Sequence, residues 1–222
     1  MPLVIAHRGV HGPGLTENTM DAYRAALDAG ADMIELDVRR TGDGQLAILH
    51  DHALGKTALD SGTLDEFEDA TGFRPPLLTE VLDWAGGGRI GLDVELKEDG
   101  YVAELAPLLS EFAAGGNKLI VTSFLDPVLA QLTELAPELD LGLLLSWTTD
   151  RYAERAAACG ARTILPEMKL VNEALVAGAI SAELDVILWD FMAASDGAWL
   201  ADTRIEGFIT DDVPGALTGL PT

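Results

Sequence analysis

The stretch Met33-Ile34-Glu35-Leu36-Asp37-Val38 places two acidic residues inside an otherwise apolar run. Successive side chains of a β-strand point to opposite faces, so Glu35 and Asp37 would share one face of a strand here. Two carboxylates on one buried face repel each other unless a positive charge lies between them, either a protein cation or a bound metal. The stretch therefore predicts a buried strand that carries either a functional site or an ion-pair network.

Similar apolar runs recur along the chain and alternate with amphipathic segments, a pattern typical of βα units around a parallel sheet. The eight runs are Leu3–Ala6, Met33–Val38, Ile90–Leu96, Leu119–Phe124, Leu141–Ser146, Thr163–Pro166, Val186–Phe191 and Gly207–Thr210. Eight strands separated by helices favour a closed (β/α)₈ TIM barrel of the α/β class over an open sheet. We find no internal repeat or linker, so the sequence predicts a single domain over residues 1–222.

A ninth run, Leu46–His50, follows the second predicted strand after only seven residues, and the last five of these, Thr41–Gln45, form the candidate turn. A parallel crossover needs a dozen or more residues, so this spacing predicts a hairpin. Folding the run back places His50 roughly level with Glu35 and Asp37. The next stretch, His52–Arg74, fits no regular element well and is expected to be a short irregular insertion after the second strand.

Three helices have readable ends. Asn18 or Thr19 is predicted to cap a helix that ends at Gly30. Pro76–Ala85 is predicted to be a second helix, and a third is expected to begin at Asp126 with a proline in its first turn.

Composition narrows the possible partners. The net charge is −23, from 37 acidic and 14 basic residues. Such a field repels nucleic-acid phosphates and anionic lipids and attracts divalent cations, so we expect no nucleic-acid partner and no stable membrane association. The single cysteine, Cys159, excludes an internal disulfide and is expected to be a buried thiol. No signal peptide or membrane span is apparent, so a cytoplasmic location is expected if this is the full natural chain.

The candidate catalytic and binding residues lie at the predicted C-terminal ends of strands, where the active sites of barrels are found. His7 and Arg8 end the first strand, and His50 ends the hairpin. On the third strand, the alternating residues are Asp93, Glu95 and Lys97. Glu95 can join the two acids of the second strand in an all-oxygen site for Mg²⁺ or Ca²⁺. Arg8 and Lys97 can supply the positive charge that a phosphate needs, or they can form an ion-pair network that only holds the barrel closed.

His7 and His50 also fit phosphodiester chemistry. Two imidazoles on either side of a metal-bound phosphate suit in-line displacement, because one takes a proton from the attacking hydroxyl and the other gives one to the leaving alkoxide. Their ordinary pKa lies near neutrality, so both roles are available.

Taken in order, the motifs resemble one family. They are His7-Arg8-Gly9, Glu17-Asn18-Thr19, Gly30–Val38, Thr41–Gly44, His50-Asp51, Glu95-Leu96-Lys97, Thr122-Ser123-Phe124 and Gly207–Asp211. Their order and approximate spacing resemble the glycerophosphodiester phosphodiesterase family over most of the chain. Two segments depart from the family pattern: Trp189–Met192, where Trp-Thr-Val-Asn is common, and Thr210–Pro214, which lacks the usual arginine.

The resemblance implies a (β/α)₈ barrel that hydrolyses a small-molecule glycerophosphodiester to an alcohol and glycerol 3-phosphate. It implies an acid/base pair, His7 and His50, and a site for Mg²⁺ or Ca²⁺ made by Glu35, Asp37 and Glu95. Arg8 and Lys97 would contact the phosphate. Attack by the substrate's own glycerol hydroxyl would give a cyclic phosphate that water then opens.

Several residues keep two interpretations. Trp189 either stacks on the glycerol or headgroup or simply packs in the core. Glu17 and Asn18 either orient the pocket or serve as a first-turn acid and an N-cap. Asp51 either orients a histidine or terminates the strand. His11 and His52 are expected at the pocket rim or on the surface.

Two other functions remain open. A lysophospholipase D-like enzyme would keep the fold and the metal and would need an apolar surface for an acyl chain. The sequence shows no basic amphipathic helix of the kind that binds anionic membranes, which disfavours this alternative. A barrel without catalysis that binds a phosphodiester or metal would not need the His7 and His50 pair.

Overall fold

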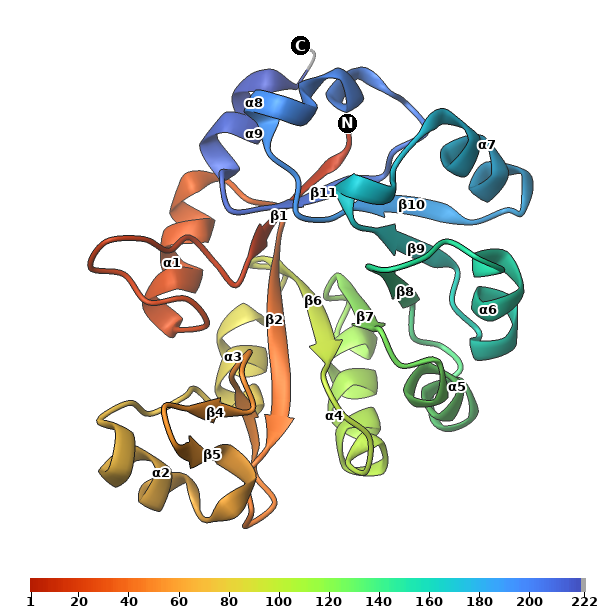
Figure 1. Cartoon of the computed structure of the whole chain (residues 1–222). Helices are drawn as coiled ribbons and strands as arrows, with labels where there is room; N and C mark the ends of the chain where they lie inside the picture. The colour runs from red at the N-terminus through yellow and green to blue at the C-terminus, as the bar shows by residue number, and fades with distance from the viewer. Residues whose placement is uncertain (221–222) are drawn as a thin grey trace.

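The computed structural model describes residues 1–220 and has a barrel of eight parallel strands at its centre (Figure 1). In hydrogen-bonded order these are β1 (Leu3–His7), β11 (Gly207–Thr210), β10 (Asp185–Leu188), β9 (Thr163–Pro166), β8 (Leu141–Leu145), β7 (Leu119–Ser123), β6 (Gly91–Leu96) and β2 (Met33–Arg40). Pairing of β1 with β2, with His7 opposite Glu35, closes the ring. The predicted (β/α)₈ barrel is confirmed, although β10 ends three residues before the predicted Phe191.

Helices lie outside the strands (Figure 1). They are α1 (Met20–Ala29), α3 (Leu78–Ala85), α4 (Val102–Ala114), α5 (Asp126–Leu135), α6 (Tyr152–Cys159), α7 (Glu173–Ser181), α8 (Ala193–Asp196) and α9 (Val213–Gly219). Thr19 caps α1 by accepting a hydrogen bond from the Ala22 amide, and Gly30 ends it in the left-handed conformation, as predicted. Short 3₁₀ turns occupy Met168–Leu170 and Gly197–Ala201.

Apolar side chains fill two layers. The larger layer lies between strands and helices and includes Tyr23, Leu36 and Phe208. The smaller fills the barrel lumen with Ile5, Met33, Ile120, Leu144, Leu165, Ile187 and Ile209. On β2 the alternation therefore turns Met33, Glu35 and Asp37 inward and Leu36 outward. The lumen changes from apolar to acidic toward the C-terminal ends of the strands.

The predicted hairpin is present. Strand β3 (Leu46–Ile48) pairs antiparallel with β2, with Val38 opposite Ile48. The Leu49 amide then donates a hydrogen bond to the carbonyl oxygen of Asp37 at 3.0 Å. Continuing this register sets His50 level with Leu36, between the two acidic residues of β2.

The insertion is more regular than predicted. It contains β4 (Ala53–Leu54), β5 (Thr57–Ala58), a 3₁₀ turn (Leu59–Ser61) and α2 (Leu64–Thr71), which lie together beside β2 in Figure 1. Thr63 and Glu66 form a capping box at the start of α2. Leu64 and Phe67 lie on the buried face of the helix and pack against the hairpin. The prediction of an irregular stretch was wrong because this short helix has only two buried apolar residues to mark its period.

Three further predictions concern Cys159, membrane-spanning helices and the domain boundary. Cys159 is buried at the end of α6, as predicted. No helix within residues 1–220 combines the length and apolar character required to cross a membrane. The predicted domain boundary at residue 222 falls outside the described residues.

Candidate active site

Four carboxyl groups converge at the C-terminal end of the lumen. Glu35 and Asp37 come from β2, and they pair in register with Asp93 and Glu95 of β6. All four side chains are buried. The oxygen atoms that Glu35, Asp37 and Glu95 offer lie within 4.8 Å of one another. The structure therefore brings together the three predicted metal ligands and adds Asp93 as a fourth buried acid.

Two cations face these acids. Lys97 Nζ lies 2.8 Å from Asp37 Oδ1 and 2.7 Å from Glu95 Oε1, and Arg8 Nε lies 3.3 Å from Asp37 Oδ2. The backbone amide of Arg8 donates a hydrogen bond to Glu35 Oε2 at 3.0 Å. When every group is ionised, four negative and two positive charges leave a net charge of −2, which one divalent cation would neutralise.

Unpartnered oxygen atoms mark where such an ion fits. Glu35 Oε1 and Asp93 Oδ2 are buried and have no polar partner, and Asp37 Oδ1 and Glu95 Oε1 are buried with Lys97 as their only partner. Buried oxygen atoms without partners are costly. Carboxylate oxygens are the ligands that Mg²⁺ and Ca²⁺ prefer. The residues present therefore fit a hard divalent cation.

Burial and mutual repulsion perturb these carboxyls. Burial raises the pKa of Glu35 well above its usual range and raises the pKa of Asp93 and of Glu95 to about 7. Burial acts the same way on Asp37, but Lys97 and Arg8 outweigh it and hold the pKa of Asp37 below its usual value. The metal-free site therefore stores electrostatic strain at neutral pH.

We expect the metal-free protein to lose stability as pH rises from about 5 to 8. Asp93 and Glu95 keep protons in the folded state that the unfolded chain has already released, so raising the pH favours unfolding. A rise in pKa from 4.5 to about 7 at Glu95 corresponds to about 3 kcal/mol, and the effects of neighbouring carboxyls do not add. The thermal midpoint with and without Mg²⁺ or Ca²⁺, measured across this range, checks it. The gain on adding metal should be larger at pH 8 than at pH 5, and an equal gain would contradict it.

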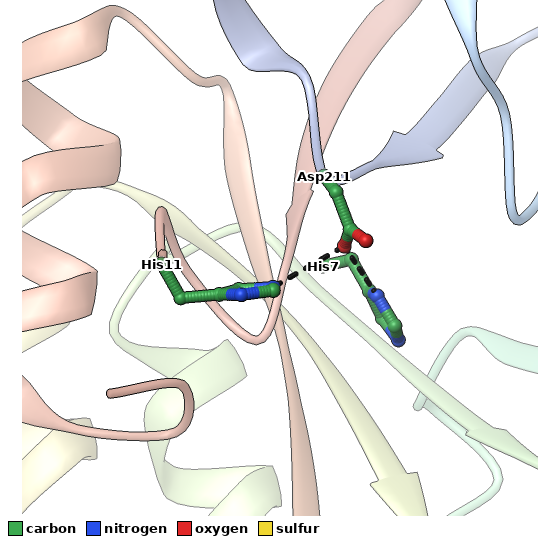
Figure 2. A group of neighbouring side chains, drawn as sticks. All are labelled: His7, His11 and Asp211. Carbon is green, nitrogen blue, oxygen red and sulfur yellow. Dashed lines mark hydrogen bonds and ion pairs between the residues drawn. The ribbon is translucent and has the colours of Figure 1, made fainter. Parts of the chain in front are cut away.

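His7 faces the acidic cluster from β1. Its Nε2 lies 4.0 Å from Glu35 Oε2, and its Nδ1 lies 2.7 Å from Asp211 Oδ1. His11 Nε2 lies 3.3 Å from the same Asp211 oxygen (Figure 2). Asp211 therefore fixes the ring of His7 with Nε2 directed toward the acids. The hydrogen bond from His7 lowers the pKa of Asp211.

His50 borders the same cavity from the hairpin. The cavity holds about 100 Å³ and is lined by His7, Arg8, Glu35, His50, Asp93, Glu95, Lys97, Thr122, Phe124, Leu144, Trp189 and Ile209. His50 Nδ1 lies 2.8 Å from Asp51 Oδ1, so Asp51 contacts the histidine, whereas β3 already ends at Ile48. Burial lowers the pKa of His50.

Trp189 forms part of the cavity wall opposite the hairpin. Its ring meets Phe124 edge-on, with centroids 5.6 Å apart, and its Nε1 donates a hydrogen bond to the Leu145 carbonyl at 3.3 Å. The tryptophan therefore packs against its neighbours and also borders the cavity. Its contact with the glycerol or headgroup stays a prediction.

The segment before α1 supports the acids and Arg8. Asn18 Nδ2 donates a hydrogen bond to Asp37 Oδ2 at 2.7 Å, and Tyr23 holds the Asn18 amide oxygen at 3.0 Å. Glu17 accepts a hydrogen bond from Arg8 at 2.9 Å. Because Thr19 caps the helix, Asn18 is free to hold Asp37. His52, by contrast, is exposed on the insertion, 3.7 Å from Asp60.

The amino-acid sequence of the chain matches the model of a known protein family. Residues 7–214 match the glycerophosphoryl diester phosphodiesterase family, a span that runs from His7 past Asp211. The chain belongs to this family. As a glycerophosphoryl diester phosphodiesterase family member, it is a phosphoric diester hydrolase.

Similar proteins cover the chain almost end to end. A glycerophosphodiester phosphodiesterase from Caldanaerobacter subterraneus subsp. tengcongensis is 28% identical over 230 residues, covering 95% of this chain and 94% of the relative. The crystal structure of a glycerophosphodiester phosphodiesterase from Agrobacterium tumefaciens matches with a TM-score of 0.79 at 24% identity, covering 97% of this chain and all of that one.

A phosphodiesterase from Oleispira antarctica, solved in complex with the product sn-glycerol-3-phosphate, matches with a TM-score of 0.83 at 22% identity, covering 98% of this chain and 96% of that one. At these identities the two structural matches show the shared fold.

Proposed function

We propose that this chain hydrolyses glycerophosphodiesters to an alcohol and glycerol 3-phosphate in a reaction that needs a divalent cation. One observation carries this proposal: His7 and His50 border a single cavity whose lining also includes three acids and two cations, Glu35, Asp93, Glu95, Arg8 and Lys97. Family membership, and the glycerol 3-phosphate found in the Oleispira antarctica enzyme, support the same substrate class.

Each group has a role in this proposal. Glu35, Asp37 and Glu95 would hold Mg²⁺ or Ca²⁺, which when bound offsets charge on the phosphate oxygens. Arg8 and Lys97 would contact the phosphate, because both reach the cavity and both carry a positive charge.

The two histidines move the protons. One takes a proton from the attacking hydroxyl, which can be the substrate's own glycerol hydroxyl, and the other gives a proton to the leaving alkoxide. The cyclic phosphate formed by the glycerol hydroxyl is then opened by water. Asp211 and Asp51 hold the Nδ1 atoms of His7 and His50, so each ring keeps Nε2 available for the exchange.

A lipid substrate has support at the rim beside the cavity. A neighbouring cavity of about 270 Å³ shares Phe124 and Leu144 with the first. Trp147 borders this second cavity and is 88% exposed, and Leu125 and Met192, which follow β7 and β10, are 39% and 42% exposed. Exposed apolar side chains that follow the C-terminal ends of β7, β8 and β10 can receive the acyl chain of a lysophospholipid, which stays on the phosphate when the headgroup leaves.

A product assay separates the two substrates. The protein is incubated with glycerophosphocholine, glycerophosphoethanolamine or a lysophospholipid in Mg²⁺ or Ca²⁺, and glycerol 3-phosphate and lysophosphatidic acid are measured. We expect glycerol 3-phosphate from the glycerophosphodiesters. Lysophosphatidic acid alone would favour the lipid substrate, and release of neither product would contradict the proposed function.

A further inference from the structure

The side chains of His7, His11 and Asp211, here called the rim cluster, offer a second set of metal ligands outside the acidic site. One nitrogen of each histidine and one oxygen of Asp211 lie within 4.8 Å of one another. Figure 2 shows both imidazole rings directed at the same carboxylate from different segments of the chain. All three are partly exposed, so an ion in solution can reach them.

The backbone holds His11 in this place. The Val10 amide donates a hydrogen bond to the Ala22 carbonyl of α1 at 3.0 Å, and Gly12 and Leu15 exchange two backbone hydrogen bonds at 2.9 and 3.0 Å. His11 therefore lies between two fixed points of the loop. The rim cluster is formed before any ion binds.

We propose that the rim cluster binds Zn²⁺ or a similar transition metal ion and that this ion inhibits the enzyme by removing His7 from proton transfer. Two imidazoles and one carboxylate suit Zn²⁺, Co²⁺ or Ni²⁺, whereas Mg²⁺ and Ca²⁺ prefer the oxygen set of Glu35, Asp37 and Glu95. One chain would thus carry two sites that accept different classes of ion.

Two of the three distances between ligand atoms are close to those around a tetrahedral ion. Ligand atoms about 2.0 Å from Zn²⁺ lie about 3.3 Å from one another, with the fourth position left to water. His11 Nε2 and Asp211 Oδ1 are 3.3 Å apart, and His7 Nδ1 and Asp211 Oδ1 are 2.7 Å apart. Of these two pairs, only the second must open, by roughly 0.6 Å, when the ion replaces the proton between them.

The consequence for His7 follows from its two nitrogens. In the neutral ring that Asp211 orients, Nδ1 carries the proton and Nε2 is free on the Glu35 side. When Zn²⁺ takes Nδ1, the proton moves to Nε2, which then has no lone pair for a substrate proton at neutral pH. His7 can no longer act as a base, and as an acid it is much weaker than an imidazolium.

Binding is measured first, without substrate. Co²⁺ is titrated into the protein in excess Mg²⁺, its absorption and stoichiometry are recorded, and Zn²⁺ is then used to displace it. We expect His11→Ala to lose one site, or to weaken it at least about tenfold. His52→Ala, which removes an exposed histidine from the insertion, should bind as the wild type does. Equal binding by all three proteins would contradict the rim site.

Inhibition is measured second, and this step rests on the function proposed above. Hydrolysis of a glycerophosphodiester is followed in saturating Mg²⁺ with added Zn²⁺, each protein being compared with its own rate in the absence of Zn²⁺. The wild type and His52→Ala should be inhibited, and His11→Ala should need at least about tenfold more Zn²⁺. If Zn²⁺ acted by displacing Mg²⁺ from the acids, all three would be inhibited alike, which would contradict the proposal. A protein with no activity but with His11-dependent Co²⁺ binding would overturn the function and keep the site.

Discussion

Replacing His50 or His7 by alanine is expected to lower kcat by about 10²-fold or more, the usual contribution of a general acid or base. Each ring borders the cavity and has a carboxylate on its Nδ1. Truncation leaves the phosphate and metal contacts in place, so KM should change less than kcat. Steady-state kinetics on a glycerophosphodiester, with glycerol 3-phosphate as the measured product, checks this.

The matched control is His52→Ala, which removes a histidine only two residues from His50. His52 is exposed and faces Asp60 outside the cavity, so its loss should leave kcat nearly unchanged. Near-normal turnover in either His7→Ala or His50→Ala would show that the ring does not take part in proton transfer.

Metal removal is expected to abolish hydrolysis, and Mg²⁺ or Ca²⁺ should restore it. The acidic site holds four carboxyls against two protein cations, so without an ion its charges are unbalanced. Glu95→Gln keeps the shape of the side chain and removes one charge. We expect this variant to lose activity while its metal-free form melts at a higher temperature than the metal-free wild type at pH 8.

Loss of activity together with a higher melting temperature distinguishes loss of metal binding from misfolding. Burial raises the pKa of Glu95 to about 7, so the charged form is disfavoured in the fold and neutralising it relieves repulsion. Glu111→Gln, an exposed change on α4, should alter neither property. Full activity of the wild type in excess chelator would remove the ion from the mechanism.

Much of the fold could be predicted because its signals are local. Buried parallel strands give apolar runs, and the hairpin follows from the five residues Thr41–Gln45, too few for a crossover. Period-2 alternation placed Glu35 and Asp37 on one face, and the same rule applied to β6 brought Glu95 and Lys97 to them.

Contacts that do not follow from the alternation of side chains along a strand could not be predicted from the sequence. Asp211 touches His7 across 204 positions in sequence, and only the closure of the barrel brings β11 beside β1. Asn18 could equally have been the cap of α1, and its bond to Asp37 depends on a left-handed backbone, with φ of 53°. Asp93 was placed on the correct face, but its burial depends on the packing of neighbouring strands.

A crystal of the protein grown or soaked with Mn²⁺ tests the central claim most directly, because anomalous scattering locates that ion and Mn²⁺ accepts the same oxygen ligands as Mg²⁺. We predict one strong anomalous peak within bonding distance of Glu35, Asp37 and Glu95, with His7 and His50 on either side of the adjoining cavity. An active, Mn²⁺-loaded enzyme whose ion lies elsewhere, with these three carboxylates bound only to Lys97 and Arg8, would contradict it.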